Sequence, residues 1–466
     1  MIQDMTVGNP TKLIVKFALP LLIGNLFQQL YNLSDIIIVG HLLGINALAA
    51  VGATAPVFFV FLLIAFGFTG GLTVVTAQRF GAKDYKGLRA SVTHSLIASA
   101  ILSVFIGISL MVFLHPLLRL MNVPAEIMDD AYTFMFILSG GMVMIVFFNL
   151  LSGFIRAVGD SKTPLYFLMF SSILNVTLNL FFIYHLKMGV AGSATGTVIA
   201  VSIAVFCCIW FIGKKFPILR LSKTDWKYRP KFMREHLNIA VPMAIQFAVL
   251  SLGMLILQSV CNSFGPEIIA ALTAAMRVEQ VATQPLLALG LAMATYAAQN
   301  WGAGKFRRIR EGVRSSAIMA LSFSIGIALL VRFVGEQMIG VFIESGNDNV
   351  VRIACEYLDI STLFYFFLGM IFVFRNTLQG IGRSGIPLAA GFTELFMRSF
   401  AAVWLAKVIG YPGLFYAGPI AWLGAGLVVT VGYWLTVRHF SLGRLRHYCK
   451  PLSAEELRLS VGTPAE

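Results

Sequence analysis

The chain has 466 residues, of which 58% are hydrophobic and 12% are charged, and its formal net charge is +14. This composition excludes a soluble globular domain. Many separate apolar runs are long enough to cross a bilayer, and the alternation of apolar and polar residues typical of a transmembrane β-barrel is absent. The sequence therefore predicts a polytopic α-helical membrane protein.

Neither a cleaved leader nor a metal site nor a cofactor is expected. Residues 1–11 lack the basic region of a secretory signal, and the first apolar run follows directly. The cysteines have no metal-ligand spacing and are expected to be small packing residues. They are Cys207, Cys208, Cys261, Cys355 and Cys449.

The first apolar run contains a line of polar side chains between Gly24 and Gly40. These residues are Asn25, Gln28, Asn32 and Asp35. Spacings of three, four and three residues place them on one face of an α-helix, as a polar stripe. A carboxylate at membrane depth costs about 2.5–3.5 kcal/mol on insertion scales. Asp35 is therefore interpreted as a proton or cation site in a polar cavity; the alternative is a carboxylate paired with an Arg on a neighbouring helix.

About twelve membrane spans follow one another along the chain. They cover residues 13–40, 53–77, 91–114, 131–154, 164–185, 189–212, 236–262, 270–297, 313–334, 356–378, 386–408 and 416–437. Lys and Arg gather in the connections after even-numbered spans, and the connection after the sixth span holds eight of them. By the positive-inside rule, both termini and these connections are cytoplasmic.

The positive net charge is therefore mainly a signal of membrane topology. Contact of the basic connections with anionic lipid head groups is expected as a side effect. Nucleic-acid binding is not expected, because no basic module interleaved with aromatic residues accompanies the charge.

The connection over residues 213–235 divides the chain nearly in half, and three segments recur across it in the same order. The separations are 222, 221 and 223 residues. The pairs are Ala18–Pro20 with Ala240–Pro242, Gln78–Ala82 with Gln299–Ala303, and Arg156–Pro164 with Gln379–Pro387. Because each half has six spans, the repeat is parallel, with its pseudo-symmetry axis along the membrane normal.

The predicted fold class is an all-α polytopic membrane protein with two six-helix lobes related by this internal repeat. Residues 1–212 form the N-lobe, 213–235 a basic cytoplasmic linker, 236–440 the C-lobe and 441–466 a cytoplasmic tail. Both termini are placed in the cytoplasm.

Glycine and proline mark turns and bends within this plan. Gly159 and Gly382 permit a tight turn, and Pro164 and Pro387 suit the first turn of the following helix, so this repeated segment is interpreted as a hairpin. Prolines inside apolar runs permit a bend: Pro20, Pro242 and Pro285. Glycines of the second span permit either a bend or close helix packing: Gly67, Gly70 and Gly71.

These segments resemble the multidrug and toxic compound extrusion (MATE) transporters, especially prokaryotic DinF-like and NorM-like members. The likeness covers nearly the whole chain. It depends on Pro20, Tyr31–Asp35, Gln78–Gly81 with its repeat, Arg156–Pro164 and Gly189–Gly192. The resemblance implies two lobes that alternate access to opposite membrane faces and export amphipathic, often cationic, compounds in exchange for H⁺ or Na⁺.

The resemblance also implies a cation-coupling site in the first half. Asp35, Asn175 and Thr197 match the family's first-span Asp, fifth-span Asn and sixth-span Thr. Where many relatives have a second Asp, this chain has Asn179. Ser171, Asn175 and Asn179 are spaced by four and share one helix face. A single carboxylate surrounded by amides and hydroxyls favours H⁺ over Na⁺, although Na⁺ at Asp35 stays an alternative.

The second half has ionisable residues of its own. Glu394 and Arg398 are four residues apart, the favourable order for an intrahelical ion pair. Arg277 and Glu279 are two apart and do not face each other, so Glu279 either attracts cationic substrates or pairs elsewhere. A seventh-span Glu found in another branch of the family is Leu250 here, which makes a second cation site doubtful.

The leading hypothesis is a monomeric antiporter of small organic cations in the cell (inner or plasma) membrane, with H⁺ or Na⁺ and membrane lipids as its other partners. A related flippase of lipid-linked precursors is the alternative. A membrane enzyme or a scaffold is a third possibility from a different class. No metal-binding, nucleophile or phosphate-loop motif supports the enzyme.

Overall fold

The computed structural model describes residues 3–342 and 347–440, and every regular element in these ranges is helical. The predicted tail over 441–466 and the side chain of Asn32 lie outside this description. The first half contains α1 (Pro10–Leu43), α2 (Ile45–Gly81), α3 (Tyr85–Leu120), η1 (Ala125–Ile127), α4 (Met128–Gly140), α5 (Met142–Ala157), α6 (Lys162–Leu180), η2 (Phe181–His185) and α7 (Val190–Lys215).

The second half follows two short turns, η3 (Pro217–Leu219) and η4 (Lys223–Trp226). It contains α8 (Pro230–Cys261), η5 (Asn262–Phe264), α9 (Pro266–Ala282), α10 (Gln284–Gly302), α11 (Phe306–Gly340), α12 (Asp348–Leu363), α13 (Tyr365–Gly380), α14 (Gly385–Phe400), η6 (Ala401–Leu405), α15 (Ala406–Ile409), α16 (Pro412–Phe415) and α17 (Ala417–Phe440).

Nine helices among the described residues are long and apolar enough to cross a membrane, and three bent pairs bring the number to twelve if each pair is one span. The pairs are α4–α5, α9–α10 and α12–α13, with bends of 46°, 42° and 50°. The second bend was predicted from Pro285, which lies in the first turn of α10 and has no backbone N–H to donate. The all-α polytopic prediction with about twelve spans is confirmed.

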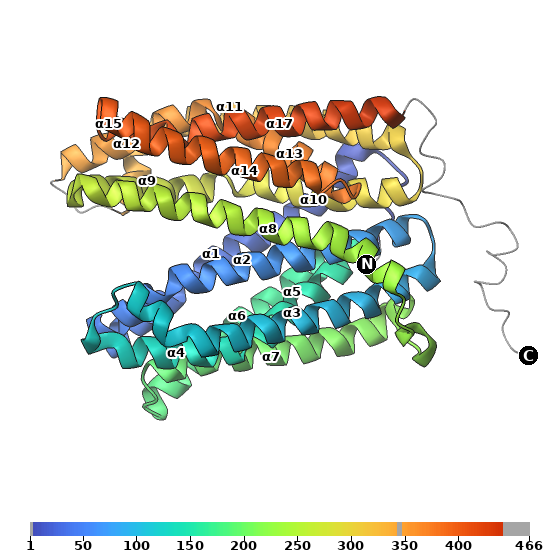
Figure 1. Cartoon of the computed structure of the whole chain (residues 1–466), viewed down its shortest axis with the longest axis horizontal. Helices are drawn as coiled ribbons and strands as arrows, with labels where there is room; N and C mark the ends of the chain where they lie inside the picture. Colours follow the sequence, from blue (N-terminus) through green and yellow to red (C-terminus); the bar gives the residue numbers. More distant parts are fainter. Residues whose placement is uncertain (1–2, 343–346, 441–466) are drawn as a thin grey trace, which may run out of the picture. The chain divides into compact units, whose positions relative to one another are not determined.

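Contacts within the chain define two compact units. Among the described residues, unit 1 is Ile23–Ala244 together with Gln3 and Asp4, and unit 2 is Met5–Leu22 together with residues 245–342 and 347–440. In unit 1, apolar side chains of α2, α3, α5 and α7 form one large core cluster. Leu72, Leu150 and Cys208 are completely buried in it. Figure 1 shows the axes of these helices roughly aligned, with α2 and α3 running in opposite directions.

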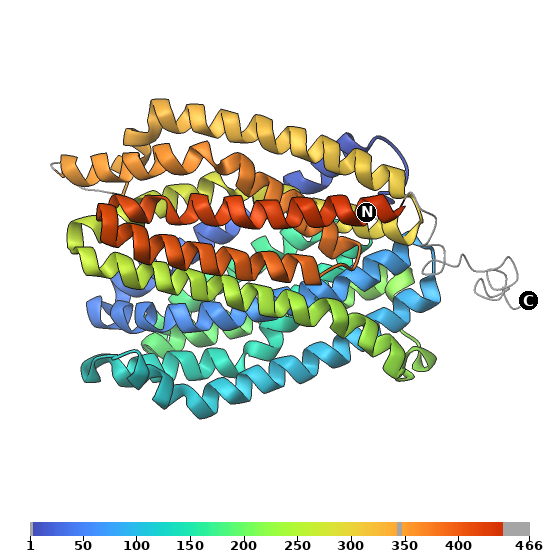
Figure 2. The ribbon, with the colours of Figure 1, turned by 45° about the horizontal axis from the view of Figure 1, so that its top comes forward.

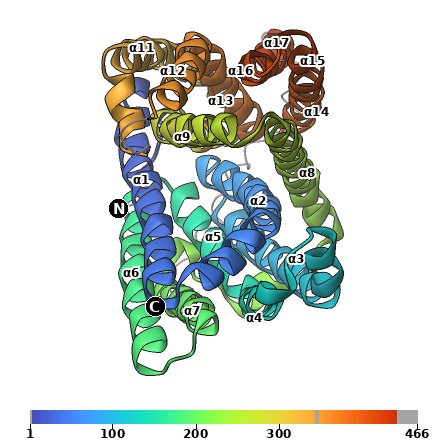
Figure 3. The ribbon, with the colours of Figure 1, turned by 90° about the vertical axis from the view of Figure 1, so that its left-hand side faces the viewer.

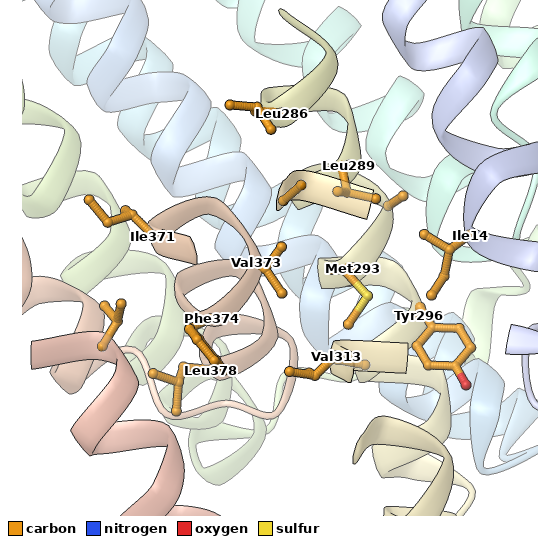
Figure 4. Close-up of a cluster of buried hydrophobic side chains, with 14 of the residues drawn as sticks. Ile14, Leu286, Leu289, Met293, Tyr296, Val313, Ile371, Val373, Phe374 and Leu378 are labelled. Carbon is orange, nitrogen blue, oxygen red and sulfur yellow. The ribbon is translucent and has the colours of Figure 1, made fainter. Parts of the chain in front are cut away.

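Unit 2 is built in the same way from the helices of the second half. Its largest apolar cluster joins α10, α11, α13 and α17, and α14 and α17 lie side by side in Figures 1 and 2. Figure 4 shows Ile14 of α1 in this cluster, together with Met293 and Tyr296 of α10. The first part of α1 therefore contributes to the core of unit 2.

Two helices pass from one unit to the other. The change falls after Leu22 in α1 and after Ala244 in α8. Each position lies two residues after a proline, Pro20 or Pro242, and the two positions are 222 residues apart, which is the offset of the sequence repeat. Both halves therefore contribute the start of their first helix to the unit formed mainly by the other half.

The repeated Gln78–Ala82 motif holds these exchanged segments. In unit 2, the backbone N–H of fully buried Met5 donates to Oε1 of Gln299 at 2.9 Å, and its carbonyl accepts from Nδ2 of Asn300 at 3.2 Å. In unit 1, Nη2 of Arg79 donates to both carboxylate oxygens of Glu235, near the start of α8, at 2.9–3.0 Å. The sequence analysis found this motif but assigned it no such role.

Close backbone approach decides between the two interpretations of the second-span glycines. A Cβ added at Gly71 would lie 2.5 Å from the Cα of Ala240 on α8, and α2 continues through Gly71 without a break. Gly71 therefore permits close helix packing rather than a bend.

The repeated Arg156–Pro164 segment is a tight hairpin, as predicted. Gly159 and Gly382 have φ values of +90° and +82°, which glycine adopts without a steric penalty. The next helices begin at Lys162 and Gly385, so Pro164 and Pro387 lie in their first turns. Asp160 accepts hydrogen bonds from the backbone N–H groups of Lys162 and Thr163 at the start of α6.

Candidate functional site

The part of α1 after Leu22, together with α6 and α7, brings the predicted coupling residues together in unit 1; Figure 3 shows these three helices next to one another. Nδ2 of Asn179 donates to Oδ1 of Asp35 at 2.6 Å and to Oδ1 of Asn175 at 3.0 Å. Nδ2 of Asn175 donates to the Thr197 hydroxyl at 2.8 Å, which donates to the Ser193 carbonyl at 3.0 Å. The carboxylate, two amides and a hydroxyl thus form one continuous hydrogen-bonded chain.

The two carboxylate oxygens of Asp35 have different surroundings. Oδ1 accepts from Asn179 and also from the hydroxyl of Ser193 at 3.4 Å. No described side chain donates to Oδ2. Ser193 was missed by the sequence analysis, although its position four residues before Thr197 on α7 places both on one face. Neutral donors therefore fix one carboxylate oxygen, and the other accepts no hydrogen bond from a described side chain.

The polar face of α6 is buried because of its helical spacing. Ser171, Asn175 and Asn179 are 7%, 2% and 0% exposed. A Cβ added at Gly196 on α7 would lie 2.1 Å from Oδ1 of Asn179, so only glycine leaves room for this amide. The π-helical turn η2 begins two residues after Asn179, and such turns are frequent at functional sites. Local sequence thus positions the amide that reaches Asp35.

The remainder of the polar stripe continues along α1. Asn25 and Gln28 are partly buried, and Nδ2 of Asn25 has no hydrogen-bond partner among the described residues. Asn32, the third member, has its side chain outside the described part of the chain. The stripe therefore offers polar atoms on the same helix as the carboxylate.

Unit 2 contains the predicted intrahelical ion pair. Nη2 of Arg398 donates to Oε1 of Glu394 at 2.6 Å, and both residues are less than 9% exposed. Nη1 of Arg398 lies 3.0 Å from Sδ of Met254 on α8. The π-helical turn η6 follows α14 just as η2 follows α6. At the offset of 223 residues, Glu394 and Arg398 take the positions of Ser171 and Asn175 in unit 1.

Glu279 and Arg277 do not face each other, in agreement with their spacing. The carboxylate of Glu279 accepts a hydrogen bond from the hydroxyl of Tyr357 on α12 at 2.5 Å. Arg277, two residues earlier on α9, is exposed. The sequence left open whether Glu279 attracts cationic substrates or pairs with another residue. The structure gives it a partner, the neutral hydroxyl of Tyr357.

Paired six-span halves with a carboxylate set among amides and hydroxyls define a multi-pass membrane transporter, not an enzyme. The MatE family profile matches the chain twice, at residues 20–181 and 242–403, once in each half. With 30% identity over 425 residues, the chain is similar to the probable multidrug resistance protein YpnP of Bacillus subtilis strain 168, and this match covers 90% of the chain and 91% of YpnP.

Two further comparisons agree. The chain is 25% identical over 413 residues to the probable multidrug resistance protein NorM of Thermotoga maritima, with 85% of this chain and 84% of that protein covered. A solved multidrug resistance MATE family transporter of the MOP superfamily, in an outward-facing conformation, matches with a TM-score of 0.87 at 25% identity, covering 94% of this chain and 98% of that one. The protein therefore belongs to the MatE family of membrane transporters, as the resemblance indicated.

Proposed function

We propose that the protein is a secondary active antiporter that exports amphipathic cationic compounds in exchange for H⁺ or Na⁺. Asp35 is the coupling carboxylate in this proposal, and its contact with Asn179 is the observation that carries it. A carboxylate at membrane depth is energetically costly, and such a residue therefore typically marks a functional site. Here its neighbours are neutral donors rather than an arginine. This supports an ion site over the structural ion pair that the sequence left as an alternative.

The donor set favours H⁺ as the coupling ion. Nδ2 of Asn179 and the hydroxyl of Ser193 both point N–H or O–H groups at Oδ1, whereas a sodium ion requires several oxygen ligands. Protonation of Oδ2 neutralises the carboxylate without rearranging these donors. One pH unit across the membrane supplies about 1.4 kcal/mol per proton, enough for a roughly tenfold gradient of a monovalent cation exchanged one for one.

The relatives' names support the class of cargo. YpnP and NorM are called probable multidrug resistance proteins, and another relative, MepA of Staphylococcus saprophyticus, a multidrug export protein. Small organic compounds are accordingly the proposed substrates, and their cationic character is proposed from the family resemblance. In unit 2, Arg398 is neutralised by Glu394, so this unit has no unpaired deep cation at that position to receive the phosphates of a lipid-linked precursor. This favours the antiporter over the flippase.

The proposed location is the plasma membrane, or the inner membrane of a cell with two, with both termini in the cytoplasm. The concentration of Lys and Arg in connections after even-numbered spans supports this orientation. A monomer is the proposed functional state.

Transport of ethidium into or out of proteoliposomes tests the proposal, with either a pH gradient or a Na⁺ gradient imposed. Wild-type protein is expected to move ethidium under the pH gradient alone. Asp35→Asn is expected to abolish movement while inserting normally, and Asp348→Asn, an exposed carboxylate at the start of α12, is expected to behave like wild type.

Movement that requires Na⁺ would replace H⁺ as the coupling ion. Full gradient-driven transport by Asp35→Asn would contradict the coupling role of the carboxylate. If neither gradient moves ethidium, translocation of a fluorescent lipid-linked phosphate by the same liposomes would transfer support to the flippase.

A further inference from the structure

The linker between α7 and α8 is a folded part of unit 1; Figure 1 shows it in green where α7 leads to α8. Phe216 and Leu219 are buried in the unit's core, at 2% and 4% exposure. Asp225, 8% exposed, accepts from the backbone and hydroxyl of Ser222 at 2.8 Å and pairs with Nε of Arg89 at 3.3 Å. These contacts fix the conformation of the linker, and Ile218 and Leu221 pack against the same core.

Hydrogen bonds to α3 place the linker beside the beginning of a membrane span. The hydroxyl of Thr93 donates to the Asp225 carbonyl at 2.9 Å, and the backbone N–H of Arg229 donates to Nε2 of His94 at 3.0 Å. Thr93 and His94 lie eight and nine residues after the start of α3, about 12–14 Å along its axis. The span predicted from sequence starts at residue 91, so the linker packs against the helix side at this level.

The end of α7 independently indicates that the linker lies at the depth where the helices enter the membrane. Nζ of Lys214 lies 4.4 Å from the ring centroid of Trp210, which is 62% exposed. A Trp next to a Lys at the end of an apolar helix is typical of the membrane–water interface. Nε of Arg220 donates to the Gly213 carbonyl at 2.6 Å, so the linker turns back toward this level after α7 ends.

The outer side of the linker interleaves aromatic and basic residues. Trp226 and Tyr228 are 50% and 55% exposed, and Lys227, Arg229 and Lys231 are exposed as well. These five residues are called the linker surface. The sequence analysis stated that no basic segment was interleaved with aromatic residues, and this was wrong for the linker. The ring of Tyr228 stacks on His94, with centroids 5.8 Å apart, so its position is fixed.

The cations of the linker surface make no ion pair among the described residues. The acidic side chains of the linker and of the adjoining helix starts are already paired with arginine: Asp84, Asp225 and Glu235. Unpaired cations next to exposed Trp and Tyr rings, at the level where helices enter the bilayer, match the chemistry of a negatively charged head group above acyl chains.

We propose that the linker surface binds anionic phospholipid head groups, with Lys227, Arg229 and Lys231 contacting the phosphates and Trp226 and Tyr228 lying at the head-group level. Only a folded linker presents these groups together, so binding depends on the bonds of Asp225 as well as on the charges. This inference does not depend on the proposed transport reaction.

The test compares purified full-length proteins in nanodiscs of phosphatidylcholine with increasing phosphatidylglycerol, using thermal unfolding and lipid retention in native mass spectrometry. Phosphatidylglycerol is expected to stabilise the wild type and to stay bound. Replacing Lys227, Arg229 and Lys231 by Gln is expected to weaken the apparent affinity about a hundredfold at low salt, since each cation near an anionic surface contributes about fivefold. Replacing Arg307, Arg314 and Arg383 by Gln removes the same charge from other exposed positions and is expected to preserve binding.

A second variant separates the folded surface from charge alone. Asp225→Asn keeps every cation of the linker surface and is expected to lose at least half of the phosphatidylglycerol effect. Equal losses in the two triple variants, or no difference between the two lipids for wild type, would overturn the proposal. Equal stabilisation by inorganic phosphate or glycerol 3-phosphate would identify a soluble anion rather than a lipid as the ligand and would also overturn it.

Discussion

Replacing Gly196 by Ala tests whether the contact between Asn179 and Asp35 matters for transport. The new Cβ would lie 2.1 Å from Oδ1 of Asn179, so the amide must turn away. It would then lose its 2.6 Å bond to Asp35 and its 3.0 Å bond to Asn175. On the scale of side-chain hydrogen bonds within membranes, this loss is about 1–3 kcal/mol. If transport requires this arrangement, its rate falls about 5–150-fold.

The assay is ethidium transport in proteoliposomes, with a control on the same helix. A Cβ at Gly213 of α7 meets nothing within 4 Å, so Gly213→Ala is expected to transport like wild type. Asn179→Ala is expected to be impaired, and adding Gly196→Ala to it should cause little further loss because the clashing oxygen is gone. Normal transport by Gly196→Ala would refute the role of the Asn179 contact. A double variant much worse than Asn179→Ala would show that the damage arises elsewhere.

Three further predictions concern stability. Glu394→Gln leaves the Arg398 guanidinium buried without its ion-pair partner; we expect thermal unfolding in detergent to show a loss of about 3–5 kcal/mol, and a smaller loss when Arg398→Met is added. Gly71→Ala forces apart backbones that leave only 2.5 Å for a Cβ, so yield and melting temperature should fall, whereas Gly52→Ala on the same helix meets nothing within 4 Å and should be neutral. Burial acts to raise the pKa of Asp225, but its hydrogen bonds and ion pair lower that pKa below the ordinary value, so the stabilisation it gives is complete above the unfolded pKa and is lost as pH falls through the folded one. The protection of the linker amides from hydrogen exchange, measured relative to the unstructured rate at the same pH, should therefore fall in acid.

Each of these has an outcome that contradicts it. An equal loss for Glu394→Gln with and without Arg398→Met would mean that the unpaired charge is not the cause. Indistinguishable melting of the two glycine variants would contradict close packing at Gly71. The protection factors of the linker amides in Asp225→Asn should be low and should not change with pH over the same acidic window. Persistence of the wild-type pH dependence would assign it to another group.

The features predicted from sequence are those set by local spacing. Apolar length gives the spans, glycine and proline give the hairpins, and a four-residue spacing gives the Glu394–Arg398 pair. The approach of Asn179 to Asp35 could be expected only through the family resemblance, because hydropathy does not say which helices adjoin. Ser193 carries no charge and stands in an apolar run, so the only local signal for it was its spacing of four residues from Thr197.

The exchange of first-helix segments is a property that local sequence does not contain. Met5 is apolar and lies outside every predicted span, yet it is completely buried in unit 2 by bonds to residues almost three hundred positions away. Only the complementarity of two distant surfaces determines such docking. The repeat carried the signal indirectly, because Gln299 and Asn300 reappear at the position of Gln78 and Arg79 without any local need for polar side chains there.

The two prolines give this exchange a physical reason. A proline cannot donate to the carbonyl four residues earlier and therefore weakens its helix at that point. Pro20 and Pro242 each stand two residues before their helix changes unit, at equivalent places in the repeat. The helix is thus most easily bent where its two parts belong to different packing cores. Bending there costs less free energy because the backbone hydrogen bond to the carbonyl four residues before the proline is already missing. In both α1 and α8, the proline and the change from one unit to the other lie together, because the sequence repeat places both at equivalent positions.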